Sequence, residues 1–267
     1  MIFLFFGVKM EYISQSLGDK QERIKRWERE MTAKQKKILL ICAGAVYLSL
    51  QTVLGVLVQL TEGRTLVIIS YACIVINAVF AIFLNTGRAS ATLTHAGLLF
   101  TLFADYFLVY SENKLMLPAM VFFNLTQLCY GARLLLLAED KKQRIVQLAL
   151  RGAVMTLGAL LPVIVLGSDA DALAIISIMY FANLLLNAGI AVSAFRRSPF
   201  LAVGLLLFIG CDIFVGFGAL HMYLPITEGT FAYFLAYPPF NAAWLFYVPS
   251  QALITLSMLR PKLDSIK

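Results

Sequence analysis

The sequence predicts an all-α membrane protein, an eight-helix transmembrane bundle with both termini in the cytoplasm. The first observation is composition, because 60% of the 267 residues are hydrophobic and 14% are charged. Soluble domains are typically about 45–50% apolar and about 25% charged. The other two observations are a series of apolar runs near the ~20 residues that cross a bilayer and an uneven placement of basic residues between them. Together they argue against a soluble globular domain.

The apolar runs predict helices, because they are too long and too continuously apolar for barrel strands, which alternate over about ten residues. Each run is bounded by charged or turn-forming residues. The eight predicted spans, in chain order, are 38–60, 66–84, 93–110, 115–137, 145–167, 171–194, 200–222 and 239–259.

The basic residues set the predicted orientation. Eight spans with the N-terminus inside leave Arg64 and Lys114 on the outer side, and the other 20 of the 22 Lys and Arg residues on the cytoplasmic side, Arg133 and Arg151 among them. Cytoplasmic loops normally carry this excess. The net charge of +7 therefore reflects membrane topology, and no nucleic-acid partner is predicted. The predicted location is the plasma membrane of a bacterium.

Three regions are predicted along the chain. Residues 1–37 form a basic cytoplasmic segment, 38–260 the membrane domain and 261–267 a short cytoplasmic tail. Within the first region, apolar residues recur at helical spacing between basic ones in 11–37. This pattern predicts an amphipathic helix on the anionic cytoplasmic leaflet, with a solvated tail as the alternative.

The cysteines indicate no metal or redox site. Cys42, Cys73, Cys129 and Cys211 all lie inside apolar runs, and the sequence holds no Cys-x-x-Cys pair. We expect them to act as small packing residues. No metal and no cofactor are predicted.

Two apolar runs carry an Asp in the same context. Gly97-Leu98-Leu99 is followed by Asp105, and Gly204-Leu205-Leu206 by Asp212, each Asp eight residues after the Gly. A carboxylate in a spanning helix costs about 2.5–3.5 kcal/mol on insertion scales. An apolar site without a cation favours the protonated, proton-donating form of a carboxyl. The repeated context therefore predicts a buried polar site.

Further matches in the same order predict an internal repeat. Asn77-Ala78 matches Asn187-Ala188, and Phe123-Asn124 with Tyr130 matches Phe240-Asn241 with Tyr247. The chain is predicted to comprise two four-helix halves of the same topology. Repeats of this kind are related by an axis along the membrane normal and often share a site between them.

Each Asp is predicted to lie about 16 Å into its helix, near the middle of the membrane, with no Lys or Arg at that depth. An alternative is that each Asp only binds a neighbouring helix through a hydrogen bond. The residues predicted to surround the carboxyls are polar but uncharged: Asn77, Asn124, Gln127, Tyr130, Asn183, Asn187, Tyr247 and Gln251.

These motifs resemble the YhhN-like lysoplasmalogenase family of eight-helix membrane proteins. The resemblance spans most of 38–259. It rests on residues 96–108 with Asp105, on residues 123–130, on the Gly204–Asp212 run, and on 244–254, where Tyr247 precedes Gln251. The family typically has His where this chain has Gln127. Ala104 and Cys211 also depart from the family pattern, which has Gly and Ser before the two Asp residues.

The resemblance implies hydrolysis of the vinyl-ether bond of a lysoplasmalogen, with Asp105 and Asp212 as an acid–base pair comparable to the paired carboxylates of glycosidases. Gln127 and Tyr130 would orient water or the headgroup. The predicted substrate-binding residues are Asn77, Asn124, Asn187, Asn241, Tyr247 and Gln251.

Two other functions stay open. Because Gln cannot exchange protons near neutral pH as His can, the chain could be a non-catalytic member that binds or senses a lysolipid. A small proton-coupled transporter with a site between repeats is a further alternative. It is disfavoured because neither Asp-bearing run is interrupted by Pro or a Gly-rich stretch near its Asp.

Overall fold

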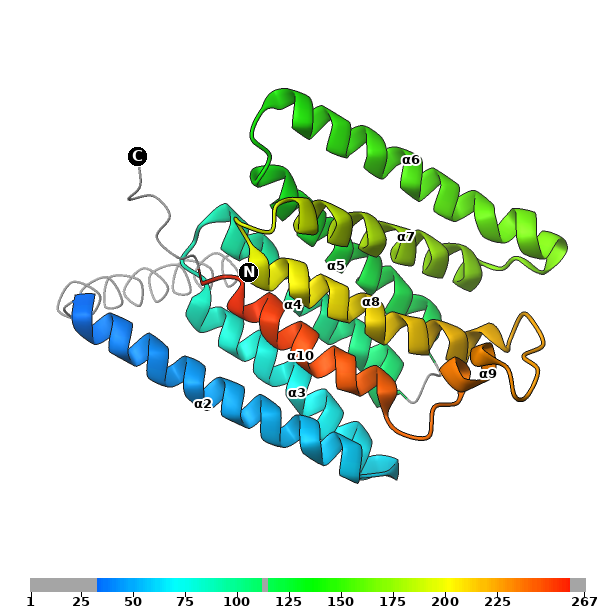
Figure 1. Cartoon of the computed structure of the whole chain (residues 1–267), viewed down its shortest axis with the longest axis horizontal. Helices are drawn as coiled ribbons and strands as arrows, with labels where there is room; N and C mark the ends of the chain where they lie inside the picture. Colours follow the sequence, from blue (N-terminus) through cyan, green and yellow to red (C-terminus); the bar gives the residue numbers. More distant parts are fainter. Residues whose placement is uncertain (1–32, 112–114, 260–267) are drawn as a thin grey trace, which may run out of the picture. The chain divides into compact units, whose positions relative to one another are not determined.

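The computed structural model describes residues 33–111 and 115–259 (Figure 1). The predicted segment 1–37 and tail 261–267 lie mostly or wholly outside this range and stay predictions. The chain divides into two compact units, residues 1–49 and 50–267. The described part of the first unit is the start of α2, and the packing below concerns the second.

All regular structure in the described residues is helical. The helices are α2 (Ala33–Leu60), α3 (Gly63–Leu84), α4 (Ala89–Asp105), η1 (Tyr106–Tyr110), α5 (Met116–Leu136), α6 (Lys141–Leu166), η2 (Gly167–Asp169), α7 (Ala172–Ser193), α8 (Pro199–Leu220), α9 (Phe231–Ala236) and α10 (Ala242–Leu256).

Seven of these helices are long and apolar enough to cross a membrane, which supports a multi-pass membrane protein. The predicted span 239–259 corresponds to α10, which has 15 residues and is shorter than a typical span. The short helix α9, in the stretch between α8 and α10, was not predicted. The all-α class is therefore confirmed, and the count of eight spans holds approximately.

Side chains and glycines fix several helix ends. Asp140 accepts a hydrogen bond from the backbone N–H of Gln143 at 2.7 Å, and Asp171 accepts one from that of Ala174 at 2.8 Å. These are the N-caps of α6 and α7. Where α6 ends, Gly167 adopts a φ of 58°, which favours glycine.

Helix pairing follows a similar pattern in the two predicted four-helix halves of the chain. The pair α4–α5 corresponds to α8–α10, α3–α4 to α7–α8, and α3–α10 to α5–α7, and all of these pairs pack together. In Figure 1, α6 runs along α7, with which it also packs. The internal repeat stays a prediction, which this pairing favours.

Two arginines counted on the cytoplasmic side lie inside the bundle. Arg133 is buried in the last turn of α5, and Arg151 is buried in α6, which begins ten residues earlier at Lys141. The charge count placed both near the cytoplasmic ends of the predicted spans 115–137 and 145–167, but it did not predict that their side chains would be buried. The side chains are accommodated because neighbouring helices supply oxygen atoms that accept their hydrogen bonds.

The depth predicted for Asp105 needs correction. α4 starts at Ala89, earlier than expected, and Asp105 is its last residue before the π-helix η1. Tyr110, where η1 ends, is within about 8 Å of Asp105 along the axis, and Leu220 is about 12 Å beyond Asp212. Asp105 therefore lies about halfway between the middle and the end of its span, whereas Asp212 lies about 4 Å from the middle of the 22-residue α8, close to the predicted depth.

Candidate functional site

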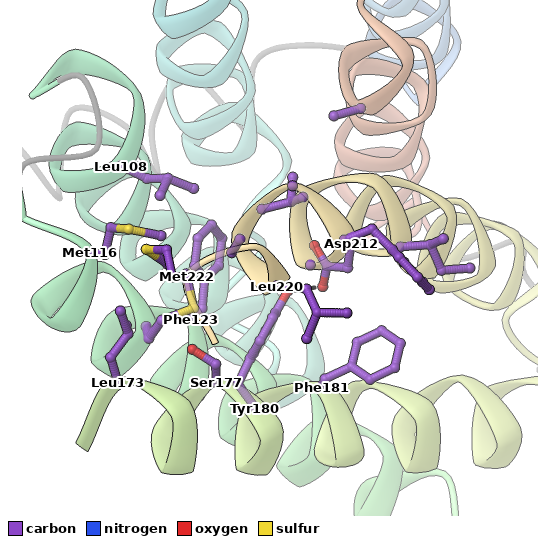
Figure 2. Close-up of a pocket in the computed structure, with 18 of the residues that line it drawn as sticks. Leu108, Met116, Phe123, Leu173, Ser177, Tyr180, Phe181, Asp212, Leu220 and Met222 are labelled. Atoms are coloured by element: carbon purple, nitrogen blue, oxygen red, sulfur yellow. Dashed lines mark hydrogen bonds between the residues drawn. The ribbon is translucent and has the colours of Figure 1, made fainter. Parts of the chain in front are cut away.

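The described residues enclose a large cavity of about 1120 Å³. Its walls come from α3, α4, η1, α5, α6, α7, α8 and α10, together with residues 221–224 after α8. Most lining side chains are aliphatic or aromatic. Figure 2 shows Leu108, Met116 and Met222 in one part of the wall and Phe181 and Asp212 in another. The cavity slightly exceeds the ~300–1,000 Å³ usual for small-molecule sites, which suits a large apolar ligand.

Both predicted carboxyls line this one cavity, although they come from α4 and α8. Asp105 is buried, whereas Asp212 is half-buried. Each accepts a hydrogen bond from a tyrosine hydroxyl, Asp105 from Tyr247 of α10 and Asp212 from Tyr180 of α7. Figure 2 shows Tyr180 reaching toward Asp212. The sequence predicted this pair of carboxyls and Tyr247, but not Tyr180.

Aromatic packing holds the two tyrosines in place. Phe208 of α8 is fully buried, and its ring centroid lies 5.4 Å from that of Tyr247 and 6.4 Å from that of Tyr180. Phe123 contacts both Tyr180 and Phe208, with centroids 5.3 Å and 6.1 Å apart. Because Phe208 packs against both tyrosines, the two rings are held in place and each hydroxyl reaches one carboxyl.

Gln127 does not line the cavity and belongs to a second polar cluster. Asn187 of α7 donates to the side-chain oxygen of Gln127 at 2.9 Å. Arg151 in turn donates to the side-chain oxygens of Asn187, at 2.9 Å, and of Asn183. All four side chains are buried, and a Cβ at Gly131 of α5 would collide with the guanidinium group. The cluster joins α5, α6 and α7.

The remaining predicted site residues also lie outside the cavity lining. Asn77 accepts a hydrogen bond from Gln51 at 3.2 Å, and Asn124 donates to the backbone oxygen of Ile176 at 3.0 Å. Asn241 donates to the backbone oxygen of Val58 at 2.8 Å, so these three side chains join helices. Tyr130 and Gln251 are buried. The binding and orienting roles predicted for these residues stay predictions.

Among the cavity residues that sequence reasoning missed, two stand in related positions. Tyr180 and Ser70 each stand seven residues before the matched asparagines, Asn187 and Asn77, and both line the cavity. Seven residues are about two helical turns, so each shares a helix face with its asparagine. The polar stripe formed by Tyr180, Asn183 and Asn187 on α7 was the available signal.

The outer rim of the cavity is tied together by one hydrogen bond. The hydroxyl of Tyr223, a lining residue, donates to Asp171 at 2.9 Å. The backbone N–H of Ala174 stabilises the Asp171 carboxylate and lowers its pKa. Partial burial raises the pKa of Tyr223 to about 12, so its hydroxyl stays protonated at neutral pH. The bond fixes the start of α7 to the segment that follows α8.

The polar groups that line the cavity are of several kinds. They include two carboxyls, the hydroxyls of serines and tyrosines, the thiol of Cys211 and the imidazole of His221. Among the described residues, no three His, Cys, Asp or Glu side chains gather closely enough to hold a metal ion.

The fold and cavity define a class of multi-pass membrane proteins that hold two carboxyl groups in a large apolar cavity. The sequence model of the YhhN family matches residues 65–258, which include every cavity-lining residue. The chain belongs to the YhhN family of lysoplasmalogenase-like polytopic membrane proteins. No curated protein and no solved structure gave a significant match.

Proposed function

We propose that this protein is a membrane lipid hydrolase that cleaves the vinyl-ether bond of lysoplasmalogen-type lysolipids. The observation that carries the proposal is the presence of Asp105 and Asp212 in one apolar cavity, each with a tyrosine hydroxyl. Family membership supports the reaction class. The predicted location in a bacterial plasma membrane remains part of the proposal.

The proposed chemistry needs one acid and one base. A protonated carboxyl gives its proton to the vinyl carbon remote from the ether oxygen, which leaves an oxocarbenium ion. Water then adds to the cationic carbon while the other carboxyl, as carboxylate, takes a proton from it. The hemiacetal so formed breaks its C–O bond to the glycerol unit and yields a fatty aldehyde and a glycerophospho-alcohol. The net reaction consumes one water, and paired carboxylates perform comparable proton transfers in glycosidases.

The place of Gln127 supports the catalytic form of the proposal. Gln127 stands where the family typically has His, but it contacts Asn187 outside the cavity lining. The departure from the family pattern therefore leaves the two carboxyls and their tyrosines unchanged. A lipid-binding protein without turnover is the alternative, and it is favoured only by the loss of the titratable imidazole.

The test is release of fatty aldehyde from a vinyl-ether lysolipid by the purified protein in lipid. Asp105→Asn and Asp212→Asn are each expected to lower the rate by about 10²–10⁴-fold, as for loss of a general acid or base. The matched control is Asp169→Asn, because Asp169 is exposed in η2 and does not line the cavity. Full activity in both cavity variants would refute the mechanism. Saturable lysolipid binding without aldehyde in the unmodified protein would establish the non-catalytic alternative.

A further inference from the structure

The cavity lies entirely in one half of the bundle. Its lining residues come from the beginnings of α3, α5, α7 and α10 and from the ends of α4, α6 and α8. By the distribution of basic residues, these are the non-cytoplasmic ends of the helices. Asp105 and Asp212 lie at the inner end of the cavity, and residues of η1, which follows Asp105, form part of its wall.

The cytoplasmic half contains buried polar side chains, and two arginines make hydrogen bonds between helices there. Arg133 donates to Thr94 at 2.8 Å and to the backbone oxygen of Ser257 at 2.7 Å. The Arg151 cluster described above occupies the space between α5, α6 and α7. Breaking these buried contacts would leave polar groups unpaired, at about 1–3 kcal/mol each. A lipid chain therefore has an apolar space on one side of the carboxyls and a packed polar region on the other.

The cavity wall includes lipid-compatible side chains that are exposed on the protein surface. Leu161 and Val165 of α6 are 50% and 60% exposed, and Met222 and Leu224 after α8 are 46% and 40% exposed. These four residues form an apolar rim. Among the described residues, no Lys or Arg lines the cavity, so its wall offers no fixed cation for a phosphate.

We infer that the cavity takes a single-chain lipid from the non-cytoplasmic leaflet through the rim formed by Leu161, Val165, Met222 and Leu224. The size of the cavity, its apolar wall and its exposed apolar rim suit one lipid chain, and its position gives the leaflet. The headgroup stays at the rim, because moving its charged phosphate from water into the apolar part of the cavity would cost too much. The inference adds leaflet and entry route to the proposed function, and its test uses binding, which requires no turnover.

Trp244 provides a built-in probe, because its side chain lines the cavity. The sequence has two tryptophans, so Trp27→Phe leaves Trp244 as the single indole. The variant also carries Thr86→Cys, in the turn between α3 and α4, and is placed in vesicles. A biotin reagent that cannot cross the membrane labels this cysteine only where the turn faces outward, so vesicles of the two orientations can be separated. A lysophosphatidylcholine brominated on its chain is then added outside. We expect Trp244 to lose most of its emission, with saturation, when the Thr86 turn faces inward, and little when it faces outward.

The matched control moves the indole by one residue. Trp244→Phe with Leu245→Trp places it on the lipid-facing side of α10, where Leu245 is 52% exposed. Its quenching should rise with lipid content and not saturate. Equal or greater quenching of Trp244 from the Thr86 side, or quenching without saturation, would overturn the inference. Saturable quenching without aldehyde release from a vinyl-ether lysolipid would support lipid entry while refuting the proposed hydrolysis.

Discussion

Each cavity carboxyl is stabilised by a hydroxyl from another helix. A carboxylate in a spanning helix costs about 2.5–3.5 kcal/mol, and a hydrogen bond to a charged group contributes about 1.5–3 kcal/mol. The bond from Tyr247 to Asp105 and that from Tyr180 to Asp212 therefore offset much of the cost. They also fix the direction in which each carboxyl points, because Phe208 packs against both tyrosine rings.

The tyrosines are accordingly predicted to be positioning residues for the proposed reaction. Tyr180→Phe and Tyr247→Phe keep the rings but remove the hydroxyls, so each should lower the rate of aldehyde release by about ten- to hundredfold, equivalent to one charged hydrogen bond. The measurement is turnover of a vinyl-ether lysolipid across a pH series. We expect the pH profile of each variant to shift, since a donated hydrogen bond stabilises the carboxylate form of the carboxyl group.

Tyr130→Phe is the comparison, because Tyr130 is buried but lies outside the cavity lining, so an unchanged rate would also count against the orienting role predicted for Tyr130. It should leave both the rate and the pH profile unchanged. If Tyr180→Phe and Tyr247→Phe lower the rate without any change in pH profile, the tyrosines act only through packing.

At the residue scale, the sequence predicts charges better than contacts. Asp105 and Asp212 were found because a carboxyl stands out in an apolar run. Tyr180 was missed because tyrosine is ordinary in such runs and only the rotation of α7 directs it to Asp212. The burial of Arg151 was missed because its partners, Asn183 and Asn187, come from a helix more than 30 residues away.

Among the helices, close approach explains the glycines that open the two Asp-containing runs. A Cβ at Gly97 would collide with the ring of Tyr130, and one at Gly204 would lie 2.7 Å from a side-chain carbon of Ile254 and 3.1 Å from its backbone nitrogen. Small residues allow helices in membranes to pack closely. These glycines bring α4 against α5 and α8 against α10.

Gly204→Ala is therefore expected to lower the free energy of unfolding by about 1–3 kcal/mol, as for an overpacked core. Because the clash involves the backbone of α10, the helix should shift and aldehyde release should also fall. The measurements are thermal unfolding in detergent and turnover.

Gly189→Ala in α7 is the control, since a Cβ there meets nothing within 4 Å. It should be neutral or stabilising, because alanine favours a helix by up to about 1 kcal/mol. Equal destabilisation by both substitutions would show that close packing at Gly204 is unimportant.

The helix boundaries show where sequence patterns are weakest. The apolar runs predicted the long helices, but they gave no sign of the π-helix η1, which has neither Pro nor Gly in residues 106–110. A π-helix often marks a functional site, and this one directly follows Asp105. The short helix α9 has only six residues, too few for a periodic signal.

The bundle of residues 50–259 is divided between a cavity half and a packed half. Apolar side chains line the space around the carboxyls, whereas buried arginines and amides hold the helices together at the other end. The distribution of basic residues predicted which end is cytoplasmic, but it did not predict that arginine side chains would be buried between the helices there. The cavity half can therefore hold a flexible lipid chain, because the packed half supplies the contacts that stabilise the fold.

Arg133 is the residue on which this separation is best tested. From α5 it donates to Thr94 of α4, to Ser198 at the start of α8 and to Ser257 at the end of α10. Arg133→Met removes all of these donors and should lower the free energy of unfolding by about 3 kcal/mol. Arg133→Lys should recover part of the loss, because an ammonium group keeps the charge but lacks the planar fork.

The measurement is thermal unfolding, with aldehyde release assayed at a temperature where each variant stays folded. Turnover per folded molecule should match that of the unmodified protein, since Arg133 does not line the cavity. A variant that unfolds normally but loses turnover would show instead that the packed half takes part in the reaction.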